Sequence, residues 1–133
     1  IGSYAAENGT VIGMEANPPI YNTNYINTTA SALELIKQVG SHGFLLNLDV
    51  GTMIQNAEQA SDLDGYVHLI HHVHISEPGL KILKKRELHR ELQQVLVMGG
   101  YNGFVSIEMG KQYDLSVIEK VMQYVGGIFG DEE

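Results

Sequence analysis

Short apolar runs alternate along this chain with segments of helical periodicity. Four runs have the length and pattern of strands, at 11–15, 44–49, 70–75 and 104–108. Apolar residues spaced three and four apart predict helices over 28–39, 87–98 and 114–125. A further short helix, capped by Asn56, is expected through Ala57 and Ala60. This alternation favours an α/β fold with a parallel sheet joined by crossover connections.

Polar side chains stand at the ends of the four strand-like runs, as Glu15, Asp49, His74 and Glu108. Successive members lie 34, 25 and 34 residues apart, close to the roughly 30 residues of one βα unit. The carboxyl ends of parallel strands share one edge, so the four should meet at one rim. Three carboxylates and an imidazole suit a hard divalent cation. A solvated carboxylate is the alternative for any one of them, but four in step favour a metal site.

Strand periodicity adds the facing of the neighbouring residues. If the four rim residues point inward, so do the residues two positions earlier, which are small or polar. These are Gly13, Asn47, His72 and Ser106. The outward set is apolar and should pack against helices; it includes Met14, Leu46, Leu48, Val73, Ile75, Val105 and Ile107. A polar inside and an apolar outside describe the upper part of a (βα)8 TIM barrel, where active sites lie.

Chain length limits how much of such a barrel is present. A full barrel needs about 250 residues and eight strands, whereas this chain has 133 residues. The opening YAAENGT is typical of the tail of a helix. We therefore expect a single domain over 1–133 that forms the C-terminal half of a barrel, strands five to eight. Its exposed sheet edges predict a homo-oligomer or association with a missing N-terminal half.

Composition narrows the partners and the compartment. The net charge of −8 argues against a nucleic-acid partner, which favours a basic face. The absence of cysteine excludes a disulfide framework and a thiolate metal site. No apolar run approaches the roughly 20 residues of a transmembrane helix, and the first ten residues lack the features of a signal peptide. These features predict a cytoplasmic protein with no membrane partner.

Four segments, MEANPPIY, NLDVGTM, HVHISEP and GYNGFVSIEM, resemble the C-terminal half of the xylose-isomerase-like TIM barrels. These are sugar and sugar-phosphate isomerases and epimerases, related to ketose 3-epimerases, hydroxypyruvate isomerase and endonuclease IV. The resemblance covers about residues 10 to 125. The order Glu, Asp, His, Glu on successive strands is fairly specific to this superfamily and says much less about the substrate.

The resemblance implies one divalent metal ion held by Glu15, Asp49, His74 and Glu108. Mn2+ is the expected ion, with Mg2+, Co2+ or Zn2+ as alternatives. In the epimerase branch the two glutamates also exchange protons with the substrate carbon. The implied activity is isomerisation or epimerisation of a small ketose or keto-polyol, free or phosphorylated, through an enediolate. The implied partner is thus a small sugar or sugar phosphate.

The sequence departs from the ketose epimerases in two places. Their aspartate strand ends in Asp-x-x-His, whereas Thr52 takes the histidine position here. Their last ligand histidine precedes an arginine-bearing loop, whereas here the first arginine is Arg86. Lys81, Lys84 and Lys85 beside it form the one basic cluster, for which a solvated helix start is favoured over a phosphate site.

Four residues are predicted to contact substrate: Asn17, Thr52, His72 and Glu77. Asn17 has a turn-shaping role as its alternative, and His72 that of a hydrogen-bonded barrel histidine. Glu77 can instead orient His74 or be a solvated loop residue. His71 should face the helix layer.

Three other functions compete with the isomerase prediction. A metal-dependent dehydratase of keto-inositols begins with the same proton abstraction. An endonuclease IV-like phosphodiesterase would need more metal ligands and a basic groove. An isolated half-barrel can also bind metal and lack a closed pocket, which would make it an inactive metal-binding protein. Nucleotide-binding and serine-hydrolase motifs are absent from the sequence.

Overall fold

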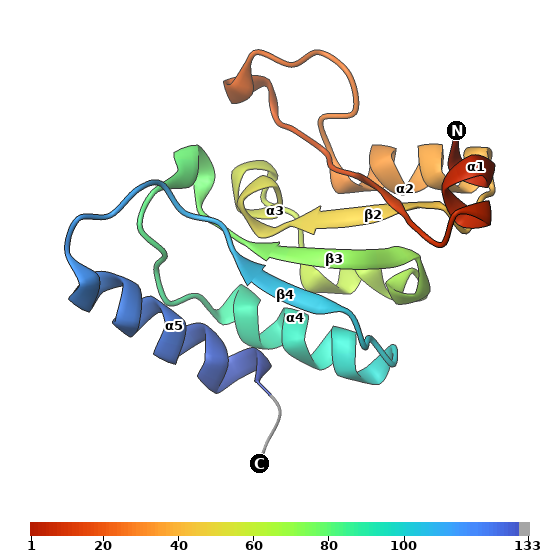
Figure 1. The fold of residues 1–133 in the computed structure, drawn as a ribbon. Coiled ribbons are helices and arrows are strands. Elements are labelled where there is room, and N and C mark those ends of the chain that lie inside the picture. Colours follow the sequence, from red (N-terminus) through yellow and green to blue (C-terminus); the bar gives the residue numbers. More distant parts are fainter. Residues whose placement is uncertain (131–133) are drawn as a thin grey trace.

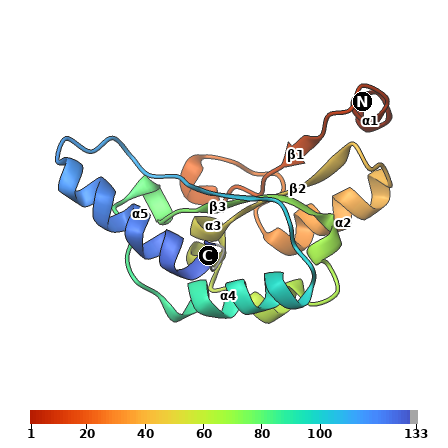
Figure 2. The same cartoon turned by 60° about the horizontal axis from the view of Figure 1, so that its bottom comes forward.

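The computed structural model describes residues 1–130 and contains one four-stranded, fully parallel sheet. The helices labelled α2 to α5 lie on one face of it, and α1 lies apart from them (Figures 1 and 2). The strands lie side by side in chain order, as β1 (Ile12–Met14), β2 (Phe44–Asp49), β3 (Ile70–Ile75) and β4 (Phe104–Ile107). The helices are α1 (Gly2–Glu7), α2 (Thr29–Val39), α3 (Val50–Asn56), α4 (Glu87–Met98) and α5 (Leu115–Phe129). Short 3-10 turns lie at Pro19–Tyr21, Ala60–Leu63, Val67–Leu69 and Pro78–Leu80.

Local capping begins α2 and α5 and ends α2 where the sequence predicted, whereas α5 continues past the predicted residue 125 to Phe129. The Thr28 hydroxyl accepts a hydrogen bond from the Ser31 amide at 3.1 Å and opens α2. Gly40 adopts the left-handed conformation that closes it. Asp114 caps α5 by accepting from the Ser116 amide at 2.9 Å. The predicted α/β alternation is therefore confirmed.

The short helix after β2 was predicted in the wrong place. It begins at Val50, directly after the strand, because the Asp49 carboxylate accepts from the Thr52 amide and acts as its N-cap. Asn56 is its last residue and not its cap, and Ala57 follows in the left-handed conformation. The consequence for function is that Asp49 ends a strand and starts a helix at the rim.

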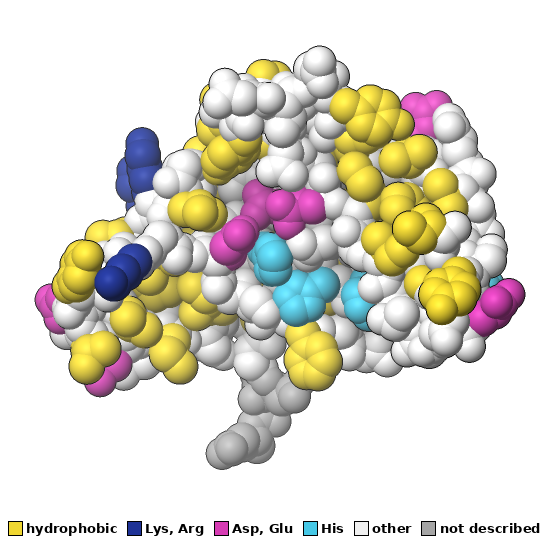
Figure 3. Space-filling model, turned by 45° about the horizontal axis from the view of Figure 1, so that its top comes forward, with side chains coloured by type: hydrophobic (Ala, Val, Ile, Leu, Met, Phe, Trp, Pro, Cys, Tyr) yellow, Lys and Arg dark blue, Asp and Glu magenta, His cyan; other side chains and the backbone are white. Residues whose placement is uncertain are grey.

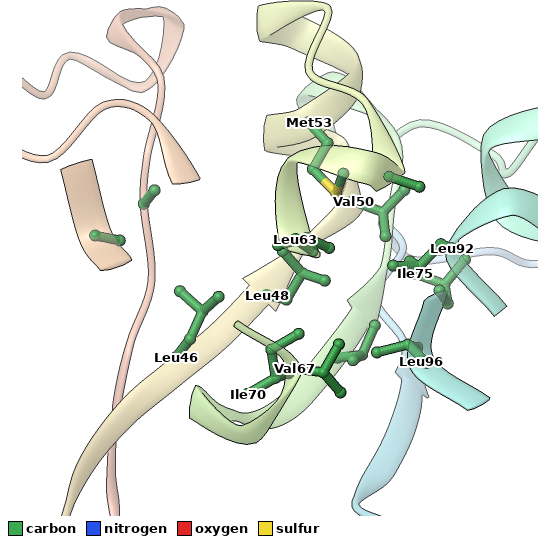
Figure 4. Close-up of a cluster of buried hydrophobic side chains, with 14 of the residues drawn as sticks. Leu46, Leu48, Val50, Met53, Leu63, Val67, Ile70, Ile75, Leu92 and Leu96 are labelled. Carbon is green, nitrogen blue, oxygen red and sulfur yellow. The ribbon is translucent and has the colours of Figure 1, made fainter. Parts of the chain in front are cut away.

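The hydrophobic core lies between the sheet and the helix layer (Figure 4). Outward-facing strand residues are fully buried there against α3, α4 and the turns between them; the cluster includes Leu46, Leu48, Val73, Ile75, Val50, Met53, Leu63, Leu92 and Leu96. Figure 2 shows α2, α4 and α5 on this side of the sheet. The opposite face carries the polar inward set, so the predicted facing of these strand residues is confirmed.

His71 is the exception to the predicted facing. The pairing of β2 with β3 steps from Leu46↔Ile70 to Asn47↔His72, so His71 has no partner on β2. This is the geometry of a β-bulge. His71 is consequently exposed and does not face the helix layer.

Among residues 1–130, no helix has both the length and the apolar character needed to span a bilayer.

Candidate metal centre

The parallel strands bring the four predicted rim residues to one edge of the sheet. Asp49 is the last residue of β2 and is paired in register with His74 on β3. Glu15 and Glu108 directly follow β1 and β4. One ligand atom each from Asp49, His74 and Glu108 lies within 4.8 Å of the others. Figure 3 shows acidic and histidine side chains gathered in the middle of this face.

Glu15 joins this cluster through His74 and Asn47. The Nδ1 atom of His74 lies 3.4 Å from Glu15 Oε2 and 3.5 Å from Glu108 Oε2. The Asn47 amide nitrogen donates to Glu15 Oε2 at 2.5 Å. One nitrogen of His74 is therefore close to a carboxylate oxygen of both glutamates.

The Asp49 carboxylate is held at both oxygens. Its Oδ1 accepts from the Thr52 amide at 2.6 Å, and its Oδ2 accepts from the Ser76 hydroxyl at 2.6 Å. These contacts come from α3 and from the segment after β3. Asp49 is thus fixed by its own helix and by the neighbouring strand.

The close carboxylates affect one another electrostatically. Burial, followed by the charge of Asp49 and then that of Glu108, raises the pKa of Glu15 above its ordinary value. The charge of His74 and a hydrogen bond from Asn17 act in the opposite direction without cancelling the rise. The neighbouring carboxylates therefore add to burial in disfavouring the ionised form of Glu15.

A divalent cation fits this donor set. The ligand atoms are carboxylate oxygens and an imidazole nitrogen, which suit Mn2+, Mg2+, Co2+ and Zn2+. A bound cation would also relieve the repulsion that Glu15 experiences from its neighbours. Asp49 is oriented by protein hydrogen bonds before any ion arrives, as is typical of metal ligands.

Two of the predicted substrate contacts lie at the rim. The Asn17 side chain is close enough to Glu15 to lower the pKa of that carboxyl in part. The ring of His72 lies edge-on to that of His74, with centroids 5.0 Å apart, and its Nε2 is 2.8 Å from the Ser106 hydroxyl. Burial, with the nearby rings of His74 and His71, lowers the pKa of His72, which favours a neutral ring.

The other two predicted contacts, Thr52 and Glu77, have their side chains engaged by the protein. Thr52 is 2% exposed, and its hydroxyl donates to the Ala16 carbonyl at 2.9 Å. Glu77 is 3% exposed and accepts two hydrogen bonds from Arg86, at 2.7 and 2.6 Å. The alternative of a solvated loop glutamate is therefore wrong for Glu77, whereas a substrate contact of either residue stays a prediction.

The basic cluster is divided between two roles. Arg86 precedes α4 and is bound to Glu77, so it belongs to the support of the loop after β3. Lys85 lies over the ring of Tyr124, with 5.6 Å between its nitrogen and the ring centroid. Lys81 and Lys84 are exposed and lie on the irregular segment before α4. They are solvated as expected, but they do not belong to the start of the helix.

Asn47 and Ser76 are the residues of the site to which the sequence assigned no role. Asn47 was expected to face inward, and its contact with Glu15 follows from that facing. Ser76 lies two residues beyond His74, so the same period of two was the available signal. However, strand alternation applies only up to Ile75, where β3 ends. The hydrogen bond from Ser76 to Asp49 joins residues 27 positions apart, and no local pattern predicts it.

No protein-family model and no curated protein matches this sequence. Solved structures do match its fold. A D-psicose 3-epimerase is 18% identical over 98% of this chain, with a TM-score of 0.80 and 53% of its own length covered. A 3-keto-D-glucoside 4-epimerase from E. coli is 23% identical over 92% of the chain, with a TM-score of 0.78 and 48% of its length covered.

A xylose isomerase domain protein from Alicyclobacillus acidocaldarius is 15% identical over 96% of the chain, with a TM-score of 0.75 and 53% of its length covered. The chain thus spans about half the length of the solved structures it matches. At these identities the likeness concerns the fold. The fold is that of half a xylose-isomerase-like TIM barrel, which confirms the expected resemblance at this level.

Proposed function

We propose that this chain is the C-terminal half of a divalent-metal-dependent isomerase or epimerase that acts on a small sugar or sugar phosphate. Its four strands would be strands five to eight of the whole barrel. The observation that carries the proposal is the convergence of Asp49, His74 and Glu108 within 4.8 Å, with Glu15 3.4 Å from His74. The sugar epimerases among the matched structures support the reaction class.

In this proposal Glu15, Asp49, His74 and Glu108 hold the ion, Mn2+ being the first choice. The cation supplies Lewis-acid stabilisation of the negative charge that develops on substrate oxygens when the proton next to the carbonyl leaves. Asp49 and His74 serve as ligands. Asn17 and His72, beside them at the rim, are the candidates for hydrogen bonds to substrate hydroxyls.

Glu15 and Glu108 are assigned the proton transfer. They follow the two edge strands, and a carboxylate oxygen of each lies near the same His74 nitrogen, Nδ1, at 3.4 and 3.5 Å. Such a pair can reach opposite faces of a bound sugar, so one carboxylate removes the proton from carbon and the other returns it. Transfer on opposite faces gives epimerisation, and transfer between adjacent carbons gives isomerisation.

The function can be tested through hydrogen exchange. The chain is incubated with Mn2+ and a panel of ketoses in D2O, and deuterium entry beside the carbonyl is followed by NMR. We expect slow exchange that Glu15→Gln and Glu108→Gln abolish. We expect a rate well below the 1–10³ s⁻¹ typical of enzymes, because four barrel strands that would close the pocket are not in this chain.

Two results would contradict the proposal. Exchange by the native chain no faster than by both glutamine variants would remove the proton-transfer role. Turnover at the full rate of an ordinary isomerase would refute the need for a second half-barrel.

Association is expected from the two open edges of the sheet. β1 and β4 each have a partner on one side only, and unpaired parallel strands recruit further strands. Large apolar side chains are exposed near these edges and on the outer helices: Ile1, Tyr4, Met98, Phe104, Leu115 and Met122. Figure 3 shows apolar patches on both sides of the acidic and histidine cluster.

We therefore predict that the chain sediments as a dimer or larger species at micromolar concentration. The partner is a second copy or a complementary half-barrel. Substituting Phe104, on the β4 edge, by Lys should shift the sedimentation toward monomer. A native chain that sediments as a well-behaved monomer would contradict the edge argument.

A further inference from the structure

Ser76 lies next to the Asp49 carboxylate and is 1% exposed. Its hydroxyl lies 2.6 Å from Asp49 Oδ2 and 2.7 Å from the amide nitrogen of Gly51. A serine hydroxyl has one hydrogen to give and can accept in return. The hydrogen therefore goes to the carboxylate, and the oxygen accepts from the Gly51 amide.

This hydroxyl completes the anchoring of Asp49. The other carboxylate oxygen accepts from the Thr52 amide at 2.6 Å, so the group is held from both sides. Rotation of the carboxylate would break one of two short hydrogen bonds inside the protein. The orientation of the Asp49 carboxylate relative to His74 and Glu108 is thus fixed by these two hydrogen bonds.

The structure leaves room for the Ser76 hydroxyl by placing a glycine opposite it. A Cβ atom on Gly51 would lie 2.7 Å from Ser76 Oγ and 3.1 Å from Asp49 Oδ1. Real Cβ atoms essentially never approach other atoms as closely as the first distance. Any side chain at position 51 would therefore displace the hydroxyl or the carboxylate.

We propose that Ser76 is a positioning residue of the metal centre, which fixes the orientation in which Asp49 meets a divalent cation. The role rests on the proposed metal-dependent function. It accounts for the pairing of a buried serine with a glycine at this point of the rim. Ser76 itself does not reach the ion; it acts through Asp49, as hydrogen-bond partners of metal ligands do.

The experiment is a calorimetric titration of the full 133-residue chain with Mn2+ alone. Loss of such a partner typically weakens metal binding by about 10- to 100-fold, and this is the effect expected for Ser76→Ala. Gly51→Ala keeps the serine but displaces its hydroxyl, so it should weaken binding in the same direction. Alanine favours helices more than glycine, so intrinsic helix propensity does not explain a loss in this variant. The added Cβ also approaches Asp49 Oδ1 to 3.1 Å, so Ser76→Ala stays the primary test.

Ser106→Ala is the matched control. Ser106 is a serine on the same face of the sheet whose hydroxyl lies 2.8 Å from His72 Nε2, so its removal also deletes one hydrogen bond. The affinity of the Ser106→Ala variant for Mn2+ should stay near that of the native chain. The melting temperatures of the metal-free variants show whether a difference in stability accounts for a difference in affinity.

The possible outcomes are distinct. Native affinity in Ser76→Ala, or equal losses in Ser76→Ala and Ser106→Ala, would overturn the positioning role while the metal site stands. If Ser76→Ala does not fold, native affinity in Gly51→Ala overturns the role as well. A native chain that does not bind Mn2+ would overturn the metal centre itself and, with it, the role of Ser76.

Discussion

Replacing His74 with alanine is expected to lower the affinity of this chain for Mn2+ by more than about 100-fold. Loss of an outer hydrogen-bond partner already costs about 10- to 100-fold, and His74 is the imidazole at the centre of the cluster. Its Nδ1 lies within 3.5 Å of a carboxylate oxygen of both glutamates. Removing the ring therefore also takes away the group that links Glu15 and Glu108. Isothermal calorimetry with Mn2+ or Co2+ measures the change.

His72→Ala provides the control for this substitution. His72 lies on the same strand and the same face as His74, with its ring 5.0 Å away. Its Nε2 is engaged by Ser106 and not by a carboxylate. Metal affinity should therefore change far less than in His74→Ala. Glu108→Gln, which keeps the shape and removes the charge, should weaken binding; unchanged affinity in both His74→Ala and Glu108→Gln would mean that this cluster is not a metal site.

The rim could be predicted because a half-buried strand alternates strictly. Leu46 and Leu48 point to the helices, so Asn47 and Asp49 must point to the other face. All strands of a parallel sheet run in the same direction, so their C-terminal residues lie at the same edge. Alternation then decides which of these residues face the same side of the sheet. The β-bulge at His71 does leave a sign in the sequence, because the buried residues Ile70 and Val73 are three positions apart instead of two. A strict period of two counted back from His74 overlooks this break and turns His71 toward the helices.

The helix after β2 was hidden for a different reason. Gly51 and Thr52 are poor helix formers and are typical of a turn. What stabilises the helix is a cap supplied by the last strand residue, Asp49, and the complete burial of Val50 and Met53. Tertiary packing outweighs local propensity in such short helices, so a pattern of propensities alone misplaces them.

The supporting contacts of the site could not be derived from spacing. Ser76 and Asp49 are separated by 27 positions, and Arg86 and Glu77 by nine. Neither interval corresponds to a repeat of a helix or a strand. The Ser76–Asp49 bond joins the carboxyl ends of two neighbouring strands, whereas Glu77 and Arg86 lie near the two ends of the one segment between β3 and α4. The sequence therefore predicts which residues reach the rim, while the fold decides which other residues hold them there.

Arg86→Ala is expected to destabilise the chain by about 3 kcal/mol, as judged by urea denaturation at neutral pH. Breaking a buried ion pair by removing one partner costs about 3–5 kcal/mol, because the remaining charge is left without compensation. The Glu77 side chain is 4% exposed, whereas that of Arg86 is 32% exposed, so water screens the pair in part and favours the lower figure. Arg90→Ala, which removes an exposed arginine of the following helix α4, should have almost no effect.

The same pair predicts how stability depends on pH. Burial alone would raise the pKa of Glu77, but the hydrogen bonds and charge from Arg86, with the Lys84 amide, hold it below its ordinary value of 4.5. A carboxylate with a lowered pKa stabilises the folded state fully above that ordinary value, and the contribution disappears as the pH falls through the lowered one. The native chain should therefore lose stability on acidification below about pH 5, and Arg86→Ala should lose much less.

A double variant separates the ion pair from packing. Glu77→Gln combined with Arg86→Ala removes both charges, so no buried carboxylate is left unpaired. It should be more stable at neutral pH than Arg86→Ala alone, and the difference measures the uncompensated charge. If the double variant is no more stable than Arg86→Ala, the arginine stabilises the loop after β3 through its alkyl chain, and Glu77 is not the group that requires it.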